Sequence, residues 1–101
     1  MNIDIMWTEM SDPAILVKLG GRIKDYRIQL GMKQSDLARL SCVGVNTIYK
    51  LEKGKSVSTA LLISILRSLS LLENIETLVP ETKLTPLQLL ALQEKMPRRV
   101  R

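Results

Sequence analysis

Four side chains near the centre of the chain have the types and spacing to bind another molecule by hydrogen bonding and packing. Within residues 45–52, the apolar residues Ile48 and Leu51 lie three apart, which is the spacing of one buried helix face. The opposite face would then present an aliphatic, an amide, a phenol and an ammonium group: Val45, Asn46, Tyr49 and Lys50. Such a face can contact a polar partner.

The composition excludes several classes of enzyme. The 101 residues include no His and one Cys, Cys42, so imidazole catalysis, the usual zinc sites and an internal disulfide lack the residues that would build them. The sequence also contains no nucleophile–base set and no glycine-rich loop for phosphate. We therefore expect a protein that binds rather than an enzyme, with no metal and no cofactor.

Two short helices and a tight turn must position the four side chains. The pattern predicts a helix at about 34–40, a turn at 41–44 and a second helix at about 45–52, with Gly54 as the left-handed stop. One apolar seam would join the two helices: Leu37, Ala38, Val43, Ile48 and Leu51.

A longer helix is predicted before this pair. Residues 11–13, Ser-Asp-Pro, combine cap residues with proline at the first helical position, and the helix would run over about 13–30 until Gly31. The Gly20-Gly21 pair inside it predicts either a break, with the true start nearer 21, or a close helix contact. Its apolar stripe comprises Ile15, Leu16, Leu19, Ile23, Tyr26 and Leu30.

Three further helices are predicted after residue 55. Ser58 would cap a fourth helix, a short fifth helix would span 73–79 before Pro80, and Thr85-Pro86 would begin a sixth helix that ends before Pro97. The stripe of the fourth helix is Leu62, Ile65, Leu66 and Leu69.

These elements predict an all-α fold, namely a five-helix domain with a short C-terminal helical extension. The predicted boundaries are an N-terminal extension at 1–12, the domain at 13–80 and a basic extension at 81–101. The length of the chain agrees with this organisation, because about 100 residues build one compact domain.

Positive charge is concentrated in two segments. The whole chain has a net charge of +5. Residues 21–58 carry eight basic and three acidic side chains, and residues 81–101 carry five basic and two acidic ones. Such segments are typical of a phosphate-binding face, although a solvated surface has the same composition. Residues 1–12 are acidic rather than signal-like, and the apolar stretch 60–72 is interrupted by polar residues, so we expect a cytoplasmic protein.

The same residues resemble the XRE family of phage-repressor and Cro-type helix-turn-helix proteins over about residues 16–79. The most specific elements are spaced as in the family: Arg27, Gln34-x-x-Leu37-Ala38, Ile48-x-x-Leu51-Glu52 and Gly54. The resemblance implies a repressor-like five-helix fold in which Ala38 lets two helices cross closely. It also implies a structural ion pair between Arg27 and Glu52, which a guanidinium can hold through two hydrogen bonds.

The resemblance implies a DNA-reading role for the outward face. Val45 would pack on a thymine methyl, Asn46 would bond adenine, Lys50 would donate to guanine, and Tyr49 would serve base or backbone. The alternative for each residue alone is the solvent side of an amphipathic helix. The residues predicted to contact the DNA backbone are Gln34, Gly44, Lys53, Lys55, Ser56 and Arg22.

The turn departs from the family pattern at two positions. Cys42 stands where the family usually has glycine, and Gly44 where it usually has a Ser or Thr cap. We interpret Cys42 as a packed turn residue rather than a redox sensor, because a lone thiol has no resolving partner.

The resulting hypothesis is a sequence-specific regulator of transcription that binds double-stranded DNA and, through it, associates with the nucleoid. One domain reads only a half-site, so we expect a homodimeric repressor at a palindromic operator, its own gene included. Relatives dimerise through the helices after the reading helix. The interface candidates there are Leu71, Leu72, Ile75, Leu78 and Val79, with segments 1–8 and 86–95 as candidate extensions. The alternative is that these apolar residues cap only the monomer's own core.

Two alternatives share the fold. One is a HipB-like antitoxin that represses its toxin–antitoxin operon and binds a protein toxin through another surface. The other is a factor that binds RNA or a protein scaffold, which a preference for single-stranded RNA would indicate.

Overall fold

The computed structural model describes residues 6–82 and 85–95, and this part of the chain consists of helices and connecting turns without a strand. The all-α prediction is confirmed. The predicted helix end at Pro97, the basic residues Arg98, Arg99 and Arg101, and residues 1–5 of the N-terminal extension lie outside the described residues. No helix in the described ranges is long and apolar enough to cross a membrane.

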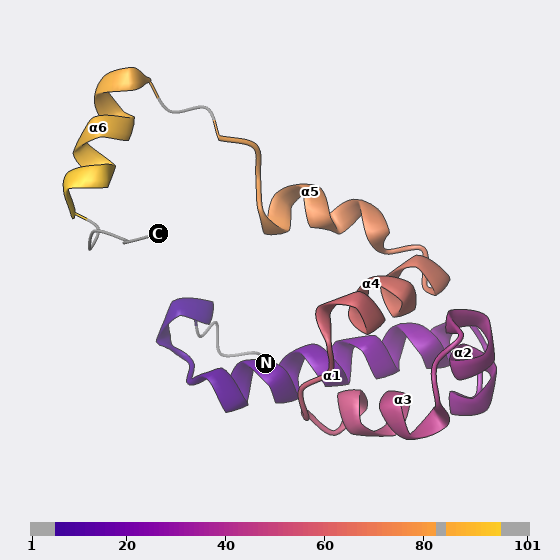
Figure 1. The fold of residues 1–101 in the computed structure, drawn as a ribbon. Helices are drawn as coiled ribbons and strands as arrows, with labels where there is room; N and C mark the ends of the chain where they lie inside the picture. The colour runs from indigo at the N-terminus through magenta and orange to yellow at the C-terminus, as the bar shows by residue number, and fades with distance from the viewer. Residues whose placement is uncertain (1–5, 83–84, 96–101) are drawn as a thin grey trace.

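The elements follow the predicted order, with α1 to α4 forming the body of the molecule and α6 lying apart from it (Figure 1). Their bounds are η1 Trp7–Glu9, α1 Asp12–Gln29, α2 Gln34–Ser41, α3 Val45–Glu52, α4 Thr59–Ser68, η2 Leu72–Asn74, α5 Ile75–Leu78 and α6 Pro86–Lys95.

The long helix α1 is continuous through its two glycines. It begins at Asp12, one residue earlier than predicted, and Ser11 caps it by accepting a hydrogen bond from the N–H of Ala14 at 3.3 Å. Of the two alternatives at the glycine pair, the structure shows the close contact: a Cβ on Gly20 would overlap the carbonyl oxygen of Leu51, whereas one on Gly21 would meet nothing. Gly20 thus lets α1 lie directly against α3.

Part of the predicted apolar stripe of α1 is wrong. Tyr26 and Leu30 are exposed, and the buried positions of the helix are Gly20, Ile23 and Arg27. These three positions follow the i, i+3, i+7 spacing of one face. An apolar count misses this face because a glycine and an arginine contribute two of its three members.

The core lies where α1 packs on α3 and where α2 packs on both α3 and α4. A buried hydroxyl, Ser41, adds a polar link in which its Oγ donates to Ser68 Oγ at 2.9 Å, and Ser68 Oγ donates to the carbonyl of Ser64 at 3.2 Å. The buried apolar side chains are Ile23, Leu37, Ala38, Ile48, Leu51, Ile65 and Leu69, and Val43 is packed against them.

The C-terminal elements are shorter than predicted or stand apart. The predicted helix at 73–79 is a 3-10 turn followed by the four-residue α5, and Val79 is already outside the helical region, with φ −134° and ψ 86°. The ring of Pro80 explains this end, because a proline disfavours helical backbone at the residue before it. At α6, Thr85 N–H donates to Gln88 Oε1 at 3.0 Å and Gln88 N–H donates to Thr85 Oγ at 3.1 Å, which is a capping box.

Candidate nucleic-acid interface

A buried guanidinium–carboxylate pair fixes the base of the helix-turn-helix. Arg27 Nε donates to Glu52 Oε2 at 2.6 Å and Arg27 Nη2 donates to Glu52 Oε1 at 3.1 Å, with the two side chains only 9% and 4% exposed. The third nitrogen, Nη1, donates to the carbonyl of Met32 at 2.8 Å. The pair implied by the resemblance is therefore present, and it joins the end of α1, the loop before α2 and the end of α3.

Gln34, the predicted phosphate contact, belongs to the same cluster. It is the first residue of α2, and its Nε2 donates to Glu52 Oε1 at 3.0 Å. The bond uses one of its two amide hydrogens and leaves the other hydrogen and Oε1 able to bind a ligand. Glu52 thus orients Gln34 as well as Arg27.

The start of α2 is also held by a carboxylate. Asp36 Oδ2 accepts a hydrogen bond from the backbone N–H of Lys33 at 2.9 Å, and this bond, with the nearby Arg39, holds the pKa of Asp36 below its ordinary value. Because the pKa of Asp36 is lowered, its carboxylate stabilises the folded state at pH values above the ordinary pKa of an aspartate. That stabilisation is lost as the pH falls through the lowered pKa.

The turn between α2 and α3 corrects one expectation. Cys42 is exposed rather than packed, and its backbone is left-handed, with φ 57° and ψ 41°. Glycine adopts this conformation without strain, which explains the family preference for glycine at this position. The packed residue of the turn is Val43, whose N–H donates to the carbonyl of Ala38 at 3.0 Å.

The recognition face is the exposed side of α3. Ile48 and Leu51 point into the core, while Val45 and Tyr49 are 49% and 51% exposed. Asn46 and Lys50 are exposed as well, so the structure brings the four predicted base-facing residues together on one helix face. Gly44 is the N-cap of α3 without a side-chain bond, and its surroundings leave room for a Cβ.

A polar hollow lies beside this face. It has a volume of about 280 Å³ and is lined by Lys24, Gln34, Tyr49, Glu52 and Lys53. The Nζ atom of Lys53 lies 5.4 Å from the centre of the Tyr49 ring, which is a cation–π distance. Because Arg27 already pairs with Glu52, the two lysines give the hollow an excess of positive charge suited to a phosphate.

Sequence reasoning missed Lys24 as a member of this site. Lys24 comes three residues before Arg27 on α1, and residues three apart are neighbours on a helix. Once Arg27 is assigned to the side facing α3, Lys24 must lie on nearly the same side. That spacing was the signal that could have found it.

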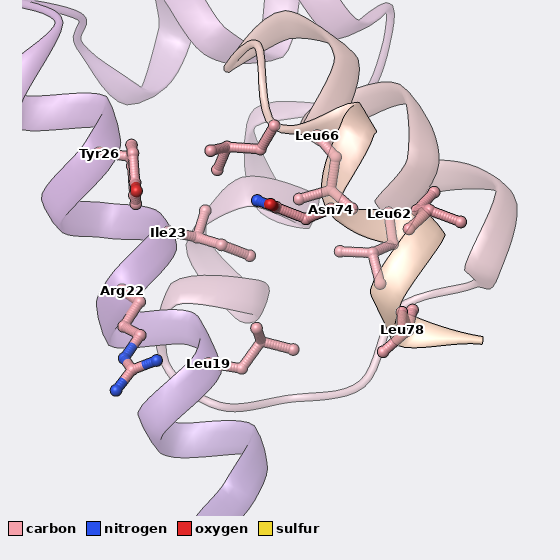
Figure 2. A pocket seen from close by; sticks show the side chains of 10 residues that line it. Leu19, Arg22, Ile23, Tyr26, Leu62, Leu66, Asn74 and Leu78 are labelled. Carbon is pink, nitrogen blue, oxygen red and sulfur yellow. The ribbon is translucent and has the colours of Figure 1, made fainter. Parts of the chain in front are cut away.

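Arg22, in contrast, is not brought together with the other predicted contacts. Its guanidinium lies 5.1 Å from the Trp7 ring, and it lines a groove between α1 and α4 (Figure 2). Residues two positions apart on an α-helix are rotated by about 200° around its axis, so Arg22 and Lys24 face opposite sides of α1. The contact to the DNA backbone predicted for Arg22 stays a prediction, and Lys24 is a further candidate on this helix.

The segment after α3 carries the remaining predicted contacts. Lys55 and Ser56 are both exposed there, and the N–H of Lys55 donates to the carbonyl of Lys50 at 2.9 Å. Gly54 adopts the predicted left-handed conformation, with φ +92°, and a Cβ there would press against Val17 of α1. The glycine thus fixes the direction in which Lys55 leaves the helix.

Two helices joined by a tight turn, with hydrogen-bonding side chains exposed on the second and a basic hollow beside them, define a DNA-binding helix-turn-helix domain. A model of a helix-turn-helix family matches residues 23–71, from the middle of α1 to the end of α4 and the residues that follow it. This match places the helix-turn-helix domain in the XRE-type family, whose members are DNA-binding transcription regulators. A search of curated proteins gave no match.

Proposed function

We propose that the protein is a homodimeric repressor that binds a palindromic operator, that of its own gene included, and blocks transcription by occupying it. The observation that carries the proposal is the exposed side of α3 beside the basic hollow, held on a base locked by Arg27 and Glu52. The mixture of apolar, amide and charged groups on α3 favours reading of base edges over charge-driven coating of DNA.

The contacts divide into two groups. Base edges would be read by Val45, Asn46, Tyr49 and Lys50. Phosphates would be bound by the Gly44 N–H, Gln34, Lys24 and Lys53 around the hollow, and by Lys55 and Ser56 after α3. Phosphate contacts set the position of the domain on the duplex, and base contacts set the preferred sequence.

The test begins with selection of a preferred duplex from random DNA by the full chain, followed by binding isotherms on matched and mismatched duplexes. We expect Asn46→Ala and Lys50→Ala to change the preference between these duplexes by about 1–3 kcal/mol. We expect Lys24→Ala and Lys55→Ala to weaken binding to all duplexes alike and to flatten the salt dependence. The exposed Gln29, at the end of α1, provides the neutral control Gln29→Ala.

Two results would contradict the proposal. Equal losses on matched and mismatched duplexes for all four variants would show that α3 does not read sequence. Tighter binding to single-stranded RNA than to any duplex would favour the RNA-binding alternative.

The antitoxin alternative uses the same DNA interface and adds a toxin as a second partner. The neighbouring reading frame separates the two hypotheses. A frame encoding a toxin that co-purifies with this protein would support the antitoxin, and an isolated gene that represses its own promoter would support the simple repressor.

A further inference from the structure

An apolar groove runs along the side of the body formed by α1, α4 and α5. Leu19 and Ile23 of α1 face Leu62 and Leu66 of α4 across it, and Leu78 of α5 closes one end (Figure 2). Its volume is about 330 Å³. The groove is far from the recognition face, because it lies on the Arg22 side of α1 and the basic hollow lies on the Lys24 side.

The groove leaves leucine side chains open to solvent. Leu78, at its end, is 69% exposed, and Leu71 and Ile75 are only partly buried. A concave apolar surface bordered by polar groups, here Arg22 and Asn74, is typical of a binding site for an amphipathic helix.

Within residues 6–82 and 85–95, the helix α6 is not packed on the body of the molecule (Figure 1). Leu87, Leu90 and Leu92 of α6 are 77%, 53% and 48% exposed, and α6 stands clear of the body (Figure 1). A ten-residue helix is marginal in water by itself, so a capped helix with three exposed leucines requires another surface to cover it.

We propose that α6 of a second copy seats in this groove, and that the two copies exchange their α6 helices reciprocally. Leu87 and Leu90 lie three apart on one face of α6, and Glu94 completes that face with a charge opposite to that of Arg22 at the groove rim. The reciprocal exchange covers the groove and the α6 leucines of each copy, and the two identical contacts are related by a two-fold axis. The inference rests on the proposed homodimer and names the contact that holds it together.

The linker fits a donated helix. The helix α5 ends at Leu78, on the wall of the groove, and α6 begins at Pro86; a connection of seven residues can span at most about 25 Å. In the structure α6 lies apart from the body, which is the arrangement of a helix available to another copy (Figure 1).

Cross-linking between two distinguishable full-length variants tests the exchange directly. Both variants carry Cys42→Ser; one adds Tyr26→Cys at the groove, and the other adds Leu90→Cys on α6. A short thiol-to-thiol cross-linker should join the mixed pair much faster than a control pair in which Leu40→Cys, at an exposed leucine of α2, replaces Tyr26→Cys. Equal rates for the two pairs would overturn the proposal, and so would an intrachain link in monomers that carry both Tyr26→Cys and Leu90→Cys.

Sedimentation without DNA gives a second measurement. Leu78→Asp and Leu90→Asp should each weaken the dimer by about tenfold to a hundredfold, because each places a charge where a leucine is buried on association. Leu40→Asp should leave the dimer unchanged. If Leu78→Asp and Leu90→Asp both dimerise as well as the unaltered protein, with the fold intact by circular dichroism, the exchange is refuted.

Failure of this inference is distinguishable from failure of the proposed function. If Leu78→Asp and Leu90→Asp leave both the dimer and operator binding unchanged, the exchange is wrong and the repressor proposal stands. If the cross-link forms but no duplex is preferred, the exchange stands without the proposed operator.

Discussion

At the scale of single residues, the turn of the helix-turn-helix contains an avoidable strain. Cys42 has a left-handed backbone, with φ 57°, and its side chain is exposed. An L-residue in this region is disfavoured by about 1–2 kcal/mol, whereas glycine is not. The thiol therefore gains no packing that would offset the strain.

We expect Cys42→Gly to stabilise the protein by about 0.5–1 kcal/mol, since the relief of strain exceeds the extra freedom of glycine in the unfolded chain. Chemical denaturation measures the change. Cys42→Ala is the control, because it removes the thiol and keeps the strained Cβ. Equal stability of the Gly and Ala variants would show that the left-handed backbone is not the cause.

The pair of Arg27 and Glu52 has the opposite effect on stability. Arg27→Ala should destabilise the fold by about 3–5 kcal/mol, because it leaves the Glu52 carboxylate buried without its main partner. Arg27→Lys should recover part of the loss, since an ammonium keeps the charge but not the two parallel hydrogen bonds. An unchanged denaturation midpoint for Arg27→Ala would contradict this role.

At the scale of elements, the contact between α1 and α3 depends on the absence of one side chain. Gly20→Ala should destabilise the protein by about 1–3 kcal/mol, because its Cβ would overlap backbone atoms of α3 that cannot move without shifting the helix. Gly21→Ala is the matched control in the same helix. It meets no neighbour and should stabilise α1 by about 1 kcal/mol.

Thermal or chemical unfolding of the two glycine variants gives the comparison. Opposite signs for the neighbouring substitutions would show that packing, rather than helix propensity, selects glycine at position 20. Two stabilising substitutions would mean that α1 and α3 are farther apart than the structure places them.

Local signals in the sequence predicted some elements closely. The bounds of α3, Val45–Glu52, match because a turn precedes the helix and the left-handed Gly54 follows it. The caps at Ser11, Ser58 and Thr85 were also predicted, and each accepts a hydrogen bond from the N–H three residues later. These features depend on neighbouring residues only.

Features set by distant contacts could not be predicted in the same way. Tyr26 looks like a core residue by spacing, but the position one residue later, Arg27, occupies the face toward α3. Arg22 and Lys24 are equally basic in the sequence, and only their spacing from Arg27, whose side of α1 is set by its distant partner Glu52, separates them. The candidate site was predicted on α3 and missed on α1 for this reason.

At the scale of the whole molecule, the proposed dimer must hold two α3 helices at a fixed separation. Helix-turn-helix dimers place them in successive major grooves about 34–36 Å apart, one turn of DNA. The sequence predicted α6 and named Leu71, Ile75 and Leu78, which line the groove, as interface candidates. The proposed seating of α6 in that groove could not be predicted, because it joins two copies of the chain.

The dimer makes binding depend on the spacing between half-sites. Inserting about five base pairs at the centre of the selected operator turns one half-site to the opposite face of the duplex. We expect affinity to fall to that of a single half-site, measured by binding isotherms on the two duplexes. Leu78→Asp, with its weakened dimer, should bind both duplexes with the same low affinity, since separate monomers do not sense spacing. If the unaltered protein also tolerated the insertion, the two domains would act independently and the palindromic operator would have to be abandoned.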